Sequence, residues 1–166
     1  LEELADKEGG GAAVAAAMMR AGIAEQRGDT EQAVNLFESV ADNQDAAPVM
    51  RDLARLRAIA IDYDSMESAE IIAALKPLAV PGKAYFASAG ELLAHAYLDQ
   101  GKRDEAGTLF AQIAKDEESP ESIRSRARQM AGVLGVDAIE DVNELLEEQR
   151  VEREGTDGES AAVATE

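Results

Sequence analysis

The sequence predicts an all-α fold, namely a right-handed superhelix (α-solenoid) of about eight antiparallel helices. Three observations favour it: a helical hairpin pattern between Glu91 and Pro120, residues that match at a fixed offset along the chain, and an alanine-rich composition with only 4% aromatic residues. Small apolar residues let helices approach closely, whereas sheets are enriched in β-branched and aromatic residues. We therefore expect closely packed helices and no sheet sandwich.

The clearest element is a pair of short helices between Glu91 and Pro120, joined at Gly101. Apolar residues recur at helical spacing on both arms. The residues expected to face each other are Leu93, Ala94 and Tyr97 on the first arm and Ala106, Leu109, Phe110 and Ile113 on the second. This spacing is typical of a tetratricopeptide repeat (TPR) hairpin, so the predicted superhelix is TPR-like.

Turn residues and capping residues divide the remainder of the chain. The run Gly9 to Gly11 is expected to break a helix that ends near Lys7. Asp29 or Thr30 is expected to cap the second helix, and Ser65 the fourth. Pro48 suits the first turn of the third helix, where its missing N–H is not needed. Outside the opening hairpin, the predicted helices span residues 12–27, 30–41, 49–62, 66–75, 120–134 and 138–152.

An internal duplication relates the two halves of the chain. Gly28 and Gly101 are 73 positions apart, and so are Phe37 and Phe110. The same offset joins Ala33 to Ala106, Leu36 to Leu109, Ala54 to Ala127, Arg55 to Arg128 and Ala58 to Ala131. Because half of this offset is close to the TPR period of about 34 residues, each unit is expected to hold two helical hairpins.

The predicted domain organisation follows from this duplication. Residues 1–11 are a linker or the end of an upstream helix, and residues 12–152 form the TPR-like helical-repeat domain. That domain divides into units at about 12–84 and 85–152. Residues 153–166 are small and polar without a period, which predicts a disordered acidic tail.

The charge of the chain limits its partners. It has 16 Lys and Arg against 34 Asp and Glu, a formal net charge of −18 at pH 7. Binding to nucleic acid or to anionic lipid needs clustered basic residues, so neither is expected. The longest apolar run is too short to span a bilayer, so membrane attachment would need an anchor that is not in this chain. We expect protein or peptide partners.

No residue pattern indicates an enzyme, a metal site or a cofactor site. The absence of cysteine excludes thiolate ligands, and the single histidine, His95, cannot form a multi-histidine zinc site. The glycine run lacks the Lys and Ser or Thr of a phosphate-binding loop. Carboxylate pairs such as Glu117 and Glu118 lie in charged runs without the apolar pocket that acid–base catalysis requires.

Repeat geometry supplies the candidate binding residues. In TPR proteins the first helix of each hairpin lines the concave groove, which binds peptides. Arg55 and Arg128, mates in the duplication, are hypothesised either to bind a partner carboxylate or to form ion pairs between helices. The residues expected in the groove are Met18, Glu25, Arg55, Ile59, Asp62, Glu91, His95, Leu98 and Arg128.

Three segments resemble a known bacterial family: RDLARLRA at 51–58, LKPLAVPG at 75–82 and ASAGELLAHAYLDQGKRDEAGTLFAQIAKD at 87–116. This family comprises membrane-anchored TPR-like proteins and includes the ancillary subunit of the SecYEG translocon. The resemblance implies a non-catalytic scaffold at the inner membrane whose soluble domain faces the periplasm. Its partners would then be translocon or envelope-assembly components.

Three other interpretations stay open on the sequence. One is a soluble cytoplasmic TPR adaptor or regulatory subunit. Another is an enzyme built on a helical scaffold, although no clustered polar constellation supports it. The last is a weak homo-oligomer that pairs through the alanine-rich first helix around Ala15 to Ala17.

Overall fold

The computed structural model describes residues 2–136, and side chains from Gly10 onward. The described chain is entirely helical, as predicted, and contains no strand. Its elements are α1 (Glu2–Gln26), α2 (Thr30–Ala41), α3 (Pro48–Asp62), the short 3-10 helix η1 (Tyr63–Ser65), α4 (Ser68–Leu75), α5 (Phe86–Asp99), α6 (Arg103–Ala114) and α7 (Glu121–Val133). The predicted eighth helix and the tail lie outside the described residues, and the right-handed superhelix stays a prediction.

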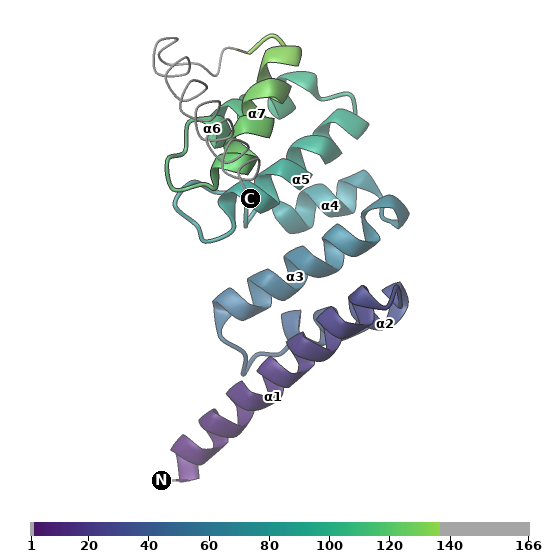
Figure 1. Cartoon of the computed structure of the whole chain (residues 1–166), viewed down its shortest axis with the longest axis vertical. Coiled ribbons are helices and arrows are strands. Elements are labelled where there is room, and N and C mark those ends of the chain that lie inside the picture. Colours follow the sequence, from purple (N-terminus) through teal and green to yellow (C-terminus); the bar gives the residue numbers. More distant parts are fainter. Residues whose placement is uncertain (1, 137–166) are drawn as a thin grey trace, which may run out of the picture.

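The helices follow one another along the long axis of the molecule, with α1 at one end and α6 and α7 at the other (Figure 1). Most helices pack on the next one in the sequence, and α5 also contacts α7. The pair α3 and α4 is the exception, because these two helices barely touch each other. Instead, α4 packs on α5. The second hairpin is therefore splayed, and its two arms join different neighbours.

Helix α1 is longer than the sequence predicts. It runs from Glu2 to Gln26 without a break at the three glycines, so the prediction of a helix starting at residue 12 is wrong. A glycine in a helix costs about 1 kcal/mol relative to alanine, which weakens a helix but does not stop it. Neither Gly10 nor Gly11 has a positive φ, and neither meets another part of the chain within 4 Å of an added Cβ. The prediction from composition therefore overstated how strongly Gly10 and Gly11 interrupt a helix.

The turns that end α1 and α5 are alike. Gly28 and Gly101 have φ of 75° and 72°, in the left-handed region that glycine adopts without strain. The following N–H groups close the turns, with Asp29 N bonded to the Ala24 carbonyl at 2.9 Å and Lys102 N to the Tyr97 carbonyl at 2.8 Å. The next helices, α2 and α6, both have 12 residues and begin 73 positions apart.

For the second, third and fourth helices, two of the predicted start residues are confirmed and one is wrong. The Asp29 carboxylate caps α2 by accepting a hydrogen bond from Gln32 N at 3.3 Å, and Pro48 is the first residue of α3. Ser65, however, is the last residue of η1, and α4 begins at Ser68 with no side-chain cap. Ser65 cannot cap α4, because it is part of the 3-10 turn and the helix starts three residues later.

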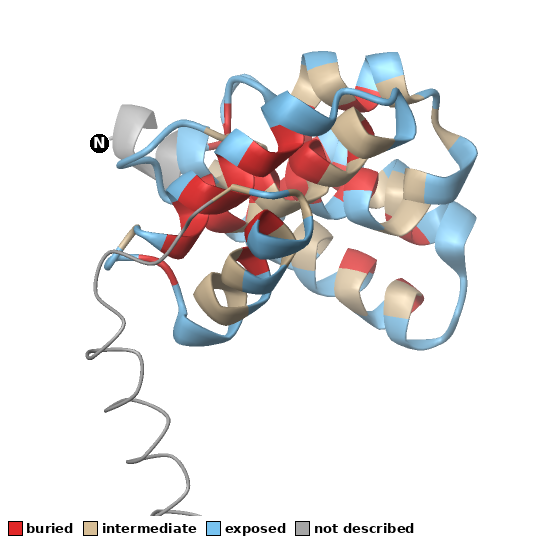
Figure 2. Cartoon of the chain, turned by 90° about the horizontal axis from the view of Figure 1, so that it is seen from above, coloured by how far each residue is buried: buried red, intermediate tan, exposed pale blue. Residues whose placement is uncertain are grey.

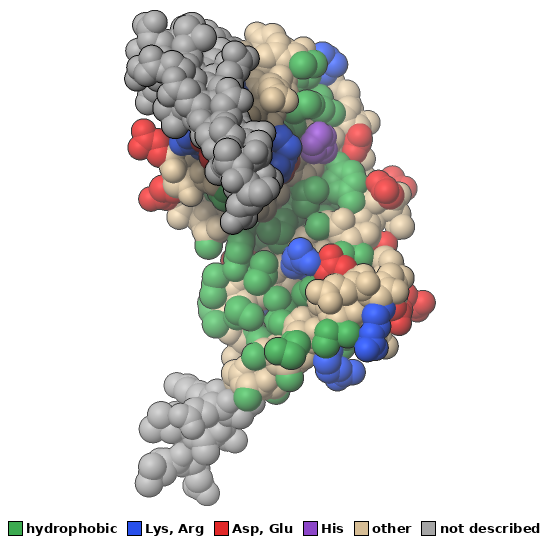
Figure 3. Space-filling model, in the orientation of Figure 1, with side chains coloured by type: hydrophobic (Ala, Val, Ile, Leu, Met, Phe, Trp, Pro, Cys, Tyr) green, Lys and Arg blue, Asp and Glu red, His purple; other side chains and the backbone are tan. Residues whose placement is uncertain are grey.

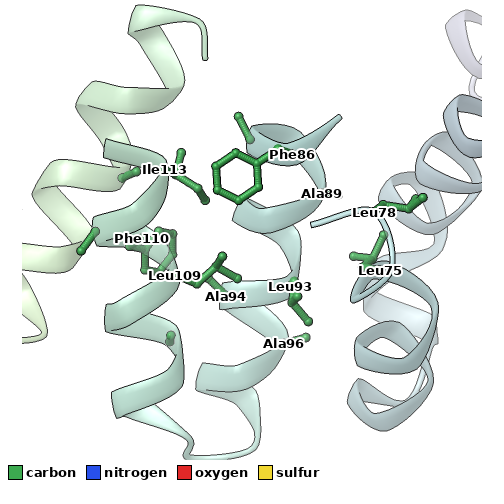
Figure 4. Close-up of a cluster of buried hydrophobic side chains, with 14 of the residues drawn as sticks. Leu75, Leu78, Phe86, Ala89, Leu93, Ala94, Ala96, Leu109, Phe110 and Ile113 are labelled. Carbon is green, nitrogen blue, oxygen red and sulfur yellow. The ribbon is translucent and has the colours of Figure 1, made fainter. Parts of the chain in front are cut away.

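Buried residues form two clusters, and α3 contributes to both. Figure 2 shows the buried residues in red where the helices pack together. The smaller cluster joins α1, α2 and α3 around Val14, Phe37 and Val40. The larger one joins α3 to α7 and is centred on the fully buried Phe110 and Ile113 (Figure 4). Nearly all the apolar residues predicted for the opening hairpin are buried, and only Tyr97 is half-buried.

Candidate partner-binding surface

Polar side chains link the first helices of neighbouring hairpins. Arg57 on α3 forms an ion pair with Glu25 on α1, and its guanidinium carbon lies 5.8 Å from the centre of the Phe37 ring. Tyr63 in η1 donates a hydrogen bond to Asp99 at the end of α5, at 2.9 Å. The helices α1, α3 and α5 are thus fixed relative to one another by contacts that skip the second arms.

The same kind of link joins α5 to α7. Arg126 makes a two-pronged contact with Glu91, with Nε 2.8 Å from Oε1 and Nη2 2.7 Å from Oε2. These hydrogen bonds, and the charge of Glu91, raise the pKa of Arg126 above its ordinary value. A planar fork that meets both carboxylate oxygens has a defined geometry. This pair therefore links α5 to α7 with a defined geometry of the two side chains.

The duplicated arginines lie on a different side of their helices. Residues two apart in a helix project to nearly opposite sides, so Arg55 points away from Arg57, and Arg128 from Arg126. Arg55 Nη2 lies 3.4 Å from the Ala41 carbonyl oxygen and 3.7 Å from Asp42, at the C-terminal end of α2. Arg128 lies 4.0 Å from Glu121 on its own helix. The two mates therefore have different surroundings, and the structure does not bring them together.

The remaining predicted residues are spread along the array. Met18, Glu25, Glu91, His95 and Leu98 are half-buried on α1 and α5. The ring of His95 meets the Phe110 ring edge-on, with centroids 5.5 Å apart. Figure 3 shows this histidine in purple at the surface. On α3, Asp62 is half-buried, whereas Ile59 is only 4% exposed and belongs to the larger core cluster.

A family model described as a tetratricopeptide repeat-like domain matches residues 1–131. The chain belongs to the TPR-like family. No curated protein and no solved structure matches it. TPR-like domains typically mediate protein–protein interactions and are generally not catalytic. As far as the family is concerned, this agrees with the non-enzymatic interpretation of the sequence.

In this TPR-like chain the described residues offer no preformed polar site for a small ligand. Every buried side-chain nitrogen and oxygen among them has a hydrogen-bond partner, and no group of three metal-binding side chains occurs there. None of the described helices is both long and apolar enough to cross a membrane.

Two shallow hollows lie elsewhere on the TPR-like array. One, of about 400 Å³, is bounded by α5, α6 and the segment that follows α4. The other, of about 420 Å³, is bounded by α1, α2 and the turn between them. Neither hollow is lined by a residue of the ion pairs that join the first arms.

Sequence reasoning missed Arg57 and Arg126, which form the ion pairs between first arms. At the 73-residue offset Arg126 corresponds to Leu53, which is one helical turn from Arg57. The two ion pairs thus serve similar interfaces, but their arginines are displaced by about one helical turn. Their carboxylates are displaced further, because Glu91 corresponds to Met18, about two turns from Glu25. A comparison at one fixed offset cannot detect such a shift. A search that also allowed a shift of one helical turn could have matched Arg126 with Arg57.

Proposed function

We propose that this chain is the interaction domain of an inner-membrane-anchored envelope scaffold in bacteria, and that it binds partners through the face formed by α1, α3, α5 and α7. The domain faces the periplasm and holds protein or peptide partners close to protein-translocation or envelope-assembly machinery. An anchor outside this chain attaches it to the membrane.

The proposed binding face is supported by three polar contacts between helices that are not neighbours in the sequence. Arg57 with Glu25 and Arg126 with Glu91 each join first arms of different hairpins, and Tyr63 with Asp99 joins η1, directly after α3, to the end of α5. A surface fixed in advance loses less entropy when a partner binds. The charged groups of the two ion pairs already have partners, so an incoming segment can lie against these pairs without burying an unpaired charge.

The location near the inner membrane is supported by the three sequence segments that resemble the anchored family, together with membership in the TPR-like family. The acidic character of the chain supports basic or apolar partner segments over acidic ones. The resemblance contributes no catalytic residue, so the proposal is for a scaffold.

Site-specific photocrosslinking in cells that express the full protein tests this proposal. Ala60 on α3 is exposed one turn from Arg57, and a photoreactive residue there should capture a translocon or envelope-assembly component. Glu38 on α2 is exposed on the opposite side of the array and serves as the control position. Equal capture from both positions contradicts the binding face. Recovery of the intact protein in the cytosolic fraction contradicts the location and favours a cytoplasmic adaptor.

A further inference from the structure

Helices α1 and α5 hold the same place in their hairpins and can be compared residue by residue at the 73-residue offset. On the side that faces the second arm, the pattern of burial agrees. Val14 corresponds to Ala87 and Ala21 to Ala94, and all four are buried. This agreement fixes the register of the comparison.

The two helices differ on the adjacent side. On α5, Ala89, Leu93 and Ala96 are at most 3% exposed, because α4 covers them. Figure 4 shows Leu75 and Leu78 on that side of α5. Their counterparts on α1 are Ala16, Arg20 and Ile23, and all three are exposed.

This exposed side of α1, which we call the α1 flank, consists of Ala16, Met19, Arg20 and Ile23. Met19 is 69% exposed and Ile23 41% exposed, and both are among the few large apolar side chains that the described chain presents to solvent. The flank is therefore an apolar surface at a position where the same fold, one unit further on, packs a helix.

The two hollows lead to the same comparison. Six residues that line the α1–α2 hollow have counterparts in the α5–α6 hollow: Arg20 and Leu93, Glu31 and Asp104, Gln32 and Glu105, Asn35 and Thr108, Leu36 and Leu109, Ser39 and Gln112. The α5–α6 hollow has an additional wall from Lys76 and Ala79, which follow α4. The α1–α2 hollow has only α1, α2 and their turn around it. Both the α1–α2 hollow and the α1 flank therefore lack a neighbour in the place that α4 and the segment after it occupy in the second unit.

We propose that the α1 flank binds an amphipathic helix of a partner protein, which lies along α1 as α4 lies along α5. The α4–α5 contact defines its apolar stripe, since Ile71 and Leu75 on α4 and Leu78 in the turn after it provide buried aliphatic side chains at i, i+4 and i+7. Such helix-in-groove recognition uses this spacing.

Arg20 defines the polar requirement. It replaces the buried Leu93 of the second unit and forms no ion pair within the part of the chain that the structure describes. A helix that covers it must supply a carboxylate, or else bury a charge without a partner. A second copy of the flank offers Met19 and Ile23 but no carboxylate, so a partner helix fits better. This site lies on another side of α1 than Glu25, so it stands or fails separately from the proposed binding face.

Binding of a designed peptide to the isotopically labelled chain tests the proposal. The probe is a synthetic peptide with the sequence of residues 66–79 that carries Leu75→Glu, and the control peptide carries Leu75→Lys. We expect the acidic peptide to shift the amide signals of Ala16, Arg20 and Ile23, with at least tenfold higher affinity than the control. Shifts confined to α5, no shifts along α1, or equal affinity of both peptides would overturn the proposal.

Variants of the chain complete the experiment. Ile23→Asp should reduce binding of the acidic peptide at least tenfold without a change in melting temperature, because Ile23 is exposed. Val133→Asp, at a residue of α7 that is 74% exposed, is the matched control and should bind normally. Arg20→Glu should reverse the preference between the two peptides. Self-association in light scattering that Ile23→Asp abolishes would identify a second copy as the occupant and would contradict the proposal.

Discussion

Tyr63 shows how one side chain ties two parts of the array together. Its hydroxyl donates to Asp99, so it connects η1 to the end of α5. Partial burial, the hydrogen bond to Asp99 and the charges of Asp99 and Asp64 all raise the pKa of Tyr63 above its ordinary value. The unfolded chain therefore loses this proton at lower pH than the folded one. The stabilisation is fully present below a pH of about 10 and is lost as the pH rises toward the folded pKa.

Alkaline titration of the tyrosines should show this effect. Tyr63 is expected to form phenolate at a pH well above the ordinary range for tyrosine, as followed by near-ultraviolet absorbance. Asp99→Asn should lower its pKa, because the hydrogen bond to a carboxylate and its negative charge are removed. Tyr63→Phe should lower the free energy of unfolding at neutral pH by about 1 kcal/mol. An unchanged titration in Asp99→Asn would show that the carboxylate does not control Tyr63.

Gly90 is a second position where one atom matters. A Cβ on this helical residue would lie 2.9 Å from Ile113 Cδ1 and 3.6 Å from Leu109 Cδ1, and Ile113 is fully buried. Gly90→Ala should therefore destabilise the fold by about 1–3 kcal/mol through overpacking, measured by urea unfolding.

Gly22→Ala is the matched control for Gly90→Ala. Nothing lies within 4 Å of a Cβ at Gly22, also within a helix. Since alanine favours the helix, this change should stabilise the fold by up to about 1 kcal/mol. Equal effects of the two substitutions would show that helix propensity, and not the contact with Ile113, decides both.

The sequence predicts residues of the hairpin interfaces well and residues of cross-helix contacts poorly. Phe37, Leu93 and Phe110 follow from apolar periodicity, because a stripe on one helix must face its immediate neighbour. The Arg126–Glu91 pair depends on how α7 is rotated relative to α5, and periodicity within one helix contains no such information. Most of the fold was therefore predictable, whereas these contacts of the candidate site were not.

At the level of elements, α1 contains a stretch with little packing against other helices, at its glycine run. Gly11, Ala12 and Ala13 are all exposed, so packing does not compensate for the low helix propensity of the glycines there. Prediction of a break at this run was reasonable from propensity, yet the helix persists. The bounds of α2 were predicted to the residue, because a capping aspartate and a turn glycine mark its start.

Substitution within the glycine run should strengthen α1. Gly11→Ala introduces a methyl group that meets nothing within 4 Å, and it should favour the helix by about 1 kcal/mol. Amide hydrogen exchange along the N-terminal half of α1 should slow several-fold, while exchange in α6 stays the same. Unchanged exchange in α1 would mean that helix propensity does not limit its stability.

At the level of the whole molecule, α3 connects two cores. Ala54 and Ala58 belong to the cluster with α1 and α2, whereas Leu56 and Ile59 belong to the cluster with α4 to α7. Because α3 barely touches α4, it joins the halves mainly through these side chains and through Tyr63. The cooperativity of unfolding should depend on them.

Leu56→Ala tests this connection. Loss of a buried leucine side chain should cost about 2–5 kcal/mol. It should also broaden the urea transition, as the two clusters come to unfold separately. Val133→Ala, at an exposed apolar residue, should leave both the midpoint and the slope unchanged. A single sharp transition at lower urea concentration in Leu56→Ala would show that other contacts couple the halves.

The contact of α4 with α5 has a consequence for how such a chain can grow. In the predicted division, α4 ends the first unit and α5 begins the second, so this interface lies across the unit boundary. An in-frame gene duplication that inserted another 73 residues would bring its own copies of both helices. Each new junction would then repeat a contact that already exists, and a longer array could evolve without a newly invented interface.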